Sequence, residues 1–191
     1  MAMIDKSFQF VLKYLNREFE LSYGLGRDVV VAGSVVNPDG SMANGFEDRI
    51  VMSLIGLEQE NSIKNGQHMH PVGNNFTKST VPVYLNMYLL FSANFDSGNY
   101  LEGLKMISKV ILTFQANPFF SNKTHPEMNG DLEKLTFEIY NLSTSDISHV
   151  WSGIGAKYMP SIVYKVRMIG FDGDLIIREI SGINKMHGNV K

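Results

Sequence analysis

The stretch Val81–Pro118 restricts the fold of this chain more than any other segment does. From Val83 to Phe91 nearly every residue is apolar or aromatic, on both of the faces that a strand presents alternately. A strand that is apolar on both faces needs cover on both, so it belongs in the middle of a sheet rather than at an edge. Pro82 agrees with a strand start here, because proline cannot donate to the ladder and is tolerated at the first strand residue.

A helix is predicted immediately after this strand. Following the turn at Asp96–Gly98, apolar residues recur at intervals of three and four from Leu101 to Phe114, which is the helical period. Asn99 is a suitable N-cap, and Pro118 closes the segment because proline cannot continue a helix. One strand followed by one helix is thus the predicted core unit, and it contains no evident catalytic group.

Length and composition indicate one ordinary globular domain. The chain has 191 residues, of which 44% are hydrophobic and 19% are charged, and no linker is visible. We therefore predict a domain over residues 1–180 and a loose tail over residues 181–191. The generous aromatic fraction of 11% suits a surface that is buried against other subunits, and it equally suits many monomers.

Net charge and cysteine content exclude several functions. Acidic residues number 19 against 17 basic ones, so no basic excess exists to neutralise phosphates, and nucleic acid is not an expected partner. The absence of cysteine excludes disulfides, thiolate metal sites and a cysteine nucleophile. The N-terminus lacks the pattern of a signal peptide, and no apolar run reaches the roughly 18 residues of a membrane span. Cytoplasmic assembly without direct membrane insertion is the expectation.

Further elements are predicted on both sides of the core unit. They are a helix capped by Asp5, strands over Asp28–Val36, Arg49–Glu58, Leu135–Leu142, Pro160–Phe171 and Asp174–Ile180, and a short helix from Ser143 to Gly155. Ser143 and Asp146 form a variant of the capping box, and Asp172–Gly173 is typical of a hairpin between the last two strands. This order predicts the α+β class: a single domain with a mixed, mostly antiparallel sheet, flanked by an N-terminal helix, a central helix and a short third helix.

Two segments are candidates for contact surfaces. Gln59–Thr80 is long and polar, and loops of this length in compact domains are usually functional or disordered; a two-stranded arm is the alternative. Its expected interaction residues are Lys64, His68, His70 and Lys78. The second candidate is the polar face of the Leu135–Leu142 strand, especially Glu138 and Tyr140, with an ordinary solvated sheet face as the alternative.

The search for chemistry finds little support for an enzyme. His68 and His70 can share one side of an extended segment, but no acidic or thiol ligand stands at a suitable spacing beside them, so solvated loop histidines are favoured over a metal site. A nucleophile elbow, a dinucleotide loop and a phosphate-binding loop are all missing. We predict no catalytic residues, no metal and no cofactor.

Three segments carry a resemblance to a known family: VPVYLNMYLLFSANF, NYLEGLKMISKVILTFQANPFF and KLTFEIYNLSTSDISHVWSGIGAKYMPSIVYKVRMIGF. Together they resemble the tube-terminator, or cap, proteins of phage-tail-like contractile injection systems, such as that of the antifeeding prophage. The resemblance covers roughly Met1 to Phe171 and rests on fold and packing residues, not on a catalytic signature. The sequence departs from the family pattern in Gln59–Thr80 and in its short C-terminal tail.

The resemblance implies a structural protein without a cofactor. Such a cap forms a ring, six-fold in this class of particle, that ends the inner tube and anchors the last sheath ring. The implied partners are further copies of the chain, the inner tube protein and the sheath protein, in a particle that is either released or membrane-anchored. The alternatives are another neck or baseplate component of a phage-like particle, or a small metal-binding protein or enzyme that uses His68 and His70.

Overall fold

The computed structural model describes residues 3–60, 69–72, 75–79, 84–128, 132–169 and 176–181. Within these residues the helices are α1 (Met3–Tyr23), α2 (Tyr100–Ala116) and α3 (Thr144–Ile154), with a short 3₁₀ turn, η1 (Pro126–Met128). The strands are β1 (Val30–Ala32), β2 (Arg49–Gln59), β3 (Met69–Val72), β4 (Asn75–Ser79), β5 (Leu85–Asn94), β6 (Phe119–Ser121), β7 (Lys134–Ile139), β8 (Ser161–Ile169) and β9 (Ile176–Ser181). The α+β class predicted from the sequence is confirmed.

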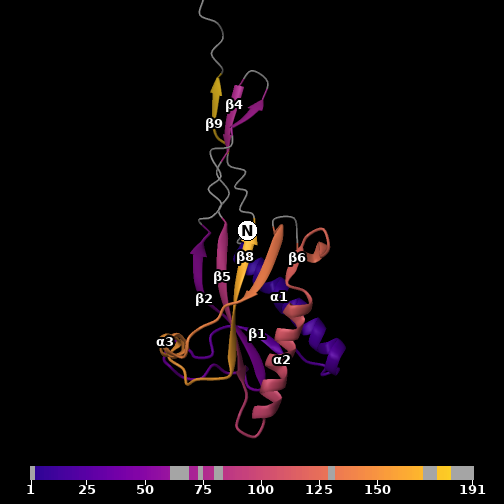
Figure 1. Ribbon diagram of the computed structural model, residues 1–191, viewed down its shortest axis with the longest axis vertical. Coiled ribbons are helices and arrows are strands. Elements are labelled where there is room, and N and C mark those ends of the chain that lie inside the picture. Colours follow the sequence, from indigo (N-terminus) through magenta and orange to yellow (C-terminus); the bar gives the residue numbers. More distant parts are fainter. Residues whose placement is uncertain are drawn as a thin grey trace, which may run out of the picture.

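Six strands form one sheet in the order β1-β2-β5-β8-β7-β6 (Figure 1). Its neighbouring strands are antiparallel, apart from the parallel pair of β1 and β2. β5 lies between β2 and β8, so the prediction of a central strand is confirmed. β2 has a register shift between Leu54 and Gly56, which is the irregularity that a glycine within a strand indicates.

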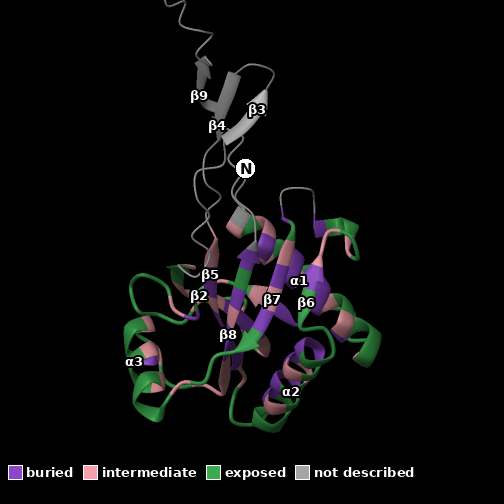
Figure 2. Cartoon of the chain, turned by 45° about the horizontal axis from the view of Figure 1, so that its top comes forward, coloured by how far each residue is buried: buried purple, intermediate pink, exposed green. Residues whose placement is uncertain are grey.

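Around Leu89, Leu90 and Phe91 the sheet is covered on both faces, which is why this part of β5 is apolar on both. On the helix face, Met87, Leu89 and Phe91 are completely buried in the larger core beneath α1 and α2. On the second face, Leu90 is buried in a smaller core with Trp151 of α3. Figure 1 shows α1 and α2 on one side of the sheet and α3 on the other, and Figure 2 shows the buried residues concentrated on the strands and on the facing sides of the helices.

Helix α2 packs through the predicted apolar stripe, with one correction. Phe114 is stacked on Phe137 of β7, with ring centroids 4.1 Å apart, and it is 2% exposed. Leu101, in contrast, is 78% exposed, because it lies on the side of α2 opposite to buried Val110, nine residues further along the helix. Asn99 stands at the N-cap position, but its side chain makes no capping hydrogen bond there; its amide instead donates to Asp48 Oδ1 at 3.3 Å.

Local signals at the ends of α3 are confirmed. The Ser143 hydroxyl accepts from the backbone N–H of Asp146, and the Asp146 carboxylate accepts from the backbone N–H of Ser143, which completes the capping box. Gly155 ends the helix with a φ of 79°, a left-handed conformation that glycine adopts without strain. The prediction that Asp5 caps α1 is wrong, because α1 begins at Met3 and Asp5 lies inside its first turn.

A second sheet has the order β3-β4-β9. Because β3 and β4 pair with each other, the described part of Gln59–Thr80 agrees with the two-stranded arm rather than with a loop throughout. β9 pairs with β4, so a hairpin between the last two strands is wrong as a pairing prediction; its turn, Asp172–Gly173, lies outside the described residues. Local turn residues indicate a reversal of the chain but not the strand that receives it.

Strands β2, β5 and β8 meet at the end of the six-stranded sheet where the chain departs toward the second sheet. Gln59, at the end of β2, pairs with Leu85, and Leu85 pairs with Met168 near the end of β8. Three connections therefore leave the large sheet from adjacent positions. None of the described helices combines the length and apolarity needed to cross a membrane. Residues 182–191 lie outside the described residues, so the division into a domain and a loose tail stays a prediction.

Candidate interaction surface

The six-stranded sheet has one face that bears α1 and α2 and a second face that bears α3. Part of this second face carries polar side chains rather than a covering helix. The strand register places Tyr88, Lys165 and Glu138 in one row across β5, β8 and β7. The adjacent row contains Glu58, Asn86 and Arg167. Residues two apart on a strand share a face, so these six side chains lie on the same side of the sheet. We call this surface, made of Glu58, Asn86, Tyr88, Glu138, Lys165 and Arg167, the open face.

Tyr88 is the centre of the open face. Its hydroxyl donates to Glu58 Oε2 at 2.6 Å, and its ring meets the ring of Tyr140 edge-on at a centroid distance of 4.9 Å. Lys165 Nζ lies 3.7 Å from the same Glu58 oxygen. The hydrogen bond to Glu58, with burial as a smaller cause, raises the pKa of Tyr88 to about 12. Tyr88 is therefore a neutral donor, held by its carboxylate partner, at any physiological pH.

Glu138 has its charge partner within the chain. Arg167 Nη2 donates to Glu138 Oε2 at 2.9 Å, and the two side chains are 49% and 46% exposed. An exposed pair of this kind contributes only about 0–1 kcal/mol to stability. The pair therefore orients two charged groups on the open face more than it stabilises the fold.

Asn86 is the buried member of the open face. It is 2% exposed, and its amide nitrogen donates to Glu60 Oε2 at 3.1 Å. Among the described residues, its Oδ1 atom has no hydrogen-bond partner. A buried acceptor without a donor is costly, so a donor supplied at this point would be stabilising.

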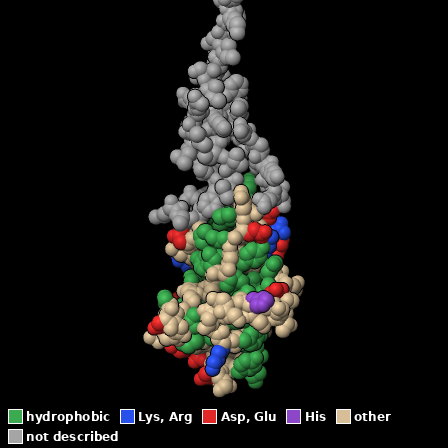
Figure 3. Space-filling model, turned by 90° about the vertical axis from the view of Figure 1, so that its left-hand side faces the viewer, with side chains coloured by type: hydrophobic (Ala, Val, Ile, Leu, Met, Phe, Trp, Pro, Cys, Tyr) green, Lys and Arg blue, Asp and Glu red, His purple; other side chains and the backbone are tan. Residues whose placement is uncertain are grey.

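Tyr140 joins the open face to a hollow beside α3. The hollow has a volume of roughly 170 Å³ and lies between α3 and the sheet, with Leu90 and Trp151 among its lining residues. Tyr140 and Ile139, which also line it, are 42% and 50% exposed. Figure 3, which views the side that bears α3, shows hydrophobic side chains interspersed with charged ones. Exposed apolar and charged side chains therefore lie close together on this side of the molecule.

The predicted interaction residues fall into two groups. Glu138 and Tyr140 are exposed and lie together at the open face. Lys64 and His68 lie outside the described residues. The backbones of His70 and Lys78 lie on neighbouring strands, where His70 pairs with Thr77 and Lys78 with Met69. An interaction role for any of these residues stays a prediction.

Sequence reasoning missed most of the open face. Glu58, Tyr88, Lys165 and Arg167 complete the network around the two predicted residues. A signal was present, since Lys165 and Arg167 are charged residues that alternate with apolar ones inside a strand. What the pattern lacked was the register that places Glu138 and Tyr88 on either side of Lys165.

The described residues offer no metal centre: no group of three or more His, Asp or Glu side chains among them is placed to hold an ion. His125 instead lies against the rings of Phe10, Tyr14 and Phe120, and its Nδ1 is 2.9 Å from the Thr124 hydroxyl. His149 is exposed on α3. The alternative that rests on His68 and His70 lies beyond the side chains that the structure describes.

The described residues form an α+β domain whose six-stranded sheet carries helices on both faces and the open face on one of them. Residues 9–181 match the family described as the Pvc16 N-terminal domain, and the chain belongs to that family. The resemblance to tube-terminator proteins noted in the sequence agrees with this membership. No curated protein matches the chain.

Two of the solved structures that match this chain share its fold as follows. One is the PVC sheath/tube terminator of an extracellular contractile injection system in its extended state, with a TM-score of 0.52 and 10% identity over 93% of this chain. The other is the tube-terminating cap of the anti-feeding prophage, with a TM-score of 0.56 and 11% identity over 94% of this chain. The match spans 62% and 60% of those two chains, so this chain corresponds to about three fifths of their length.

Proposed function

We propose that this chain is the cap of a contractile injection system, which ends the inner tube and anchors the last sheath ring. The observation that carries the proposal is membership of the Pvc16 N-terminal domain family over residues 9–181. The shared fold with a sheath/tube terminator and with a tube-terminating cap supports it. The role is structural and non-enzymatic, and its location is one end of an injection particle.

The partners in this proposal are further copies of the chain, the inner tube protein and the sheath protein. A ring, six-fold in the expected form, follows when a head-to-tail contact between copies closes on itself. A ring whose outer surface differs from that of the tube then ends an otherwise open stack. The rigid core around β5 supports this role, because it holds the contact surfaces in fixed relative positions.

Deletion of the gene tests the terminator role. Without a cap, tubes and sheaths are expected to vary widely in length, because nothing stops the addition of further rings. The measurement is the length distribution of particles by electron microscopy, with the wild-type gene supplied in trans as the restoring control. Particles of unchanged, uniform length would refute the cap function and would favour another neck or baseplate role.

The open face is the proposed contact of the cap with the tube or sheath. It combines charged groups with the buried Asn86 acceptor, which has no described donor, and exposed Tyr140 lies beside it. Arg167→Glu replaces the ion pair of Arg167 and Glu138 by two like charges. A gene that carries this substitution is expected not to restore uniform particle length in the deletion strain. Lys105→Glu on α2 is the matched control, since the two side chains are 49% and 52% exposed and the charge change is equal. Equal complementation by the two variants would exclude the open face.

The polar segment Gln59–Thr80 is a separate proposed contact, through Lys64, His68, His70 and Lys78. Its length and polarity have no purely local explanation. A chain that lacks the tip of this segment is expected to fold, because the six-stranded sheet does not include it, but to cap particles poorly. Normal rings and normally capped particles from this variant would end the idea.

A further inference from the structure

A tight turn in the connection between β1 and β2 carries Asn44 followed by Gly45. Both residues are exposed, and Gly45 has a φ of 82°, in the left-handed region that glycine adopts without strain. A Cβ atom added at Gly45 would meet no atom within 4 Å, so the space beside this peptide is open. Among the described residues, neither the Asn44 side chain nor the N–H of Gly45 has a hydrogen-bond partner. No hydrogen bond to these residues therefore has to break before the two groups can react.

We infer that Asn44 is a site of spontaneous covalent modification, at which its side-chain amide is converted to a carboxylate. The backbone nitrogen of Gly45 attacks the side-chain carbonyl carbon of Asn44, the amide group leaves as ammonia with the proton of that nitrogen, and a cyclic imide forms. Glycine permits this ring closure well, because it has no Cβ atom to crowd the attacking nitrogen. Water then opens the imide, so one water is consumed and one ammonia released, without oxidation or reduction.

Both ends of this turn are held by hydrogen bonds. On one side, the N–H of Ala43 donates to Val35 O at 3.0 Å. On the other side, Phe46 O accepts from Asn94 Nδ2 at 2.9 Å. When water opens the imide at its main-chain carbonyl, the product is isoaspartate, which adds one atom to the backbone between these two anchors. The extra length is therefore expected to displace Ala43 or Phe46.

A displacement of Phe46 affects the smaller core on the second face. Phe46 packs against that core, which includes Val35 and Trp151. Its ring lies where Gly33 has no side chain, since a Cβ atom at Gly33 would be 2.6 Å from Phe46 Cζ. Because a closely packed region has little room to adjust, isoaspartate at position 44 is expected to loosen this core. Ordinary aspartate, the other product, keeps the backbone length and adds only one negative charge.

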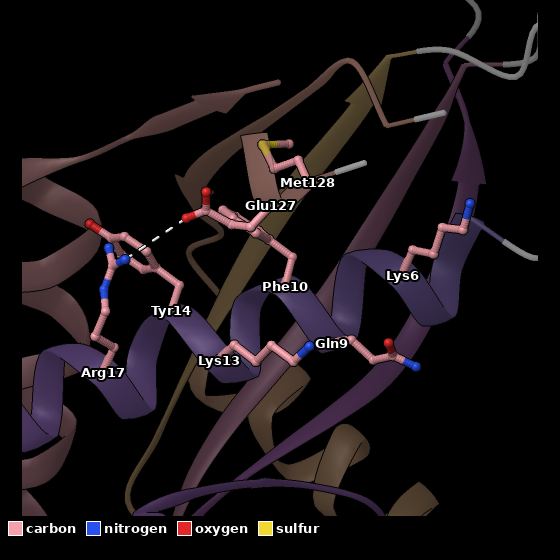
Figure 4. Close-up of a pocket in the computed structure, with 8 residues that line it drawn as sticks. All are labelled: Lys6, Gln9, Phe10, Lys13, Tyr14, Arg17, Glu127 and Met128. Atoms are coloured by element: carbon pink, nitrogen blue, oxygen red, sulfur yellow. Dashed lines mark ion pairs between the residues drawn. The ribbon is translucent and has the colours of Figure 1, made fainter. Parts of the chain in front are cut away.

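Two other exposed side-chain amides are internal comparisons. Asn37, in the same connection, precedes Pro38, whose nitrogen carries no hydrogen and cannot form the imide, and its amide donates to Ser41 Oγ at 3.0 Å. Gln9 projects from α1 (Figure 4), and the backbone nitrogen that follows it lies inside the helix, where its N–H is hydrogen-bonded. Both amides are therefore expected to persist.

Peptide-resolved mass spectrometry tests the site on the purified full chain, incubated for weeks at physiological temperature and pH in water enriched in a heavy oxygen isotope. Trypsin cleaves after lysine and arginine, so the peptide of residues 28–49 contains both Asn37 and Asn44, and the Asn-Gly pairs at 65–66 and 129–130, outside the described residues, fall in other peptides. Asn44 is expected to lose its amide progressively and to take up labelled oxygen, while Asn37 and Gln9 stay intact. An intact Asn44, or equal loss at Asn37, would overturn the inference.

Asn44→Gln is the matched variant, because glutamine keeps the amide but must close a larger ring, which forms more slowly. The urea midpoint of the Trp151 fluorescence transition is expected to fall on incubation of the wild type, as isoaspartate accumulates, and to fall less in Asn44→Gln. Freshly prepared Asn44→Asp, which gains the charge without the extra backbone atom, is expected to keep the midpoint of the fresh wild type. Equal falls in the wild type and Asn44→Gln would overturn the expected effect on the smaller core. These measurements involve no particles, so their outcome is independent of the proposed cap function.

Discussion

Phe114→Ala is expected to lower the free energy of unfolding by about 3–5 kcal/mol. The ring is 2% exposed and stacks on Phe137 with an interplanar angle of 9°. The rings of Phe91 and Tyr164 approach it at centroid distances of 5.7 and 5.0 Å. Truncation therefore loses the transfer free energy of the side chain, leaves a cavity, and removes ring contacts that each contribute about 0.5–1.5 kcal/mol beyond burial.

The consequence for the fold is large because a domain of this kind has a total stability of about 5–15 kcal/mol. The assay is urea unfolding followed by the fluorescence of Trp151, which is the single tryptophan of the chain and is 3% exposed on the second face. Because Phe114 lies in the core on the helix face and Trp151 in the core on the second face, a shift of the Trp151 transition in Phe114→Ala also shows that the two cores unfold together.

Phe119→Ala is the matched control, since Phe119 is 56% exposed on β6 and its removal is expected to change stability by no more than about 0.5 kcal/mol. Phe114→Leu is expected to fall between the two, because an aliphatic side chain fills much of the volume without the ring stacking. If Phe114→Ala and Phe119→Ala shifted the urea midpoint equally, α2 would not be packed on the sheet as described.

Two further substitutions probe the open face and α3. Glu58→Gln is expected to lower the pKa of Tyr88 from about 12 toward 10.0, read by tyrosine-resolved NMR titration. In the wild type, the stability that protonated Tyr88 contributes is fully present below pH 10 and is lost as the pH rises toward about 12. The Glu58→Gln variant should therefore lose less stability over this pH range. An unchanged titration of Tyr88 would contradict its hydrogen bond to Glu58. Ser143→Ala is expected to lower the free energy of unfolding by about 1 kcal/mol, measured by thermal unfolding. Ser148→Ala, inside the same helix, is the control and is expected to lower it by less than about 0.5 kcal/mol. Equal losses in the two variants would contradict the capping box.

The open face could be predicted only in part. Glu138 was identifiable because it is polar in a strand of otherwise alternating apolar residues. Its partner Arg167 was not, since the two are 29 residues apart in the chain and meet only through the β7–β8 register. The hydrogen bond from Tyr88 to Glu58 depends on the β2–β5 register in the same way, and that register shifts between Leu54 and Gly56. No local pattern contains this information.

The sequence by itself determined the elements whose signals are local. The apolar run of β5, the helical period of α2 and the Ser143–Asp146 capping box each lie within a short stretch of chain, where backbone geometry and side-chain chemistry act directly. The tertiary structure decided what depends on pairing between distant segments. It joined β9 to β4 and placed α1 and α3 on opposite faces of the six-stranded sheet. Non-local strand pairing and packing choose among arrangements that are locally equivalent, and for that reason the pairs of Tyr88 with Glu58 and of Arg167 with Glu138 appear only in the folded chain.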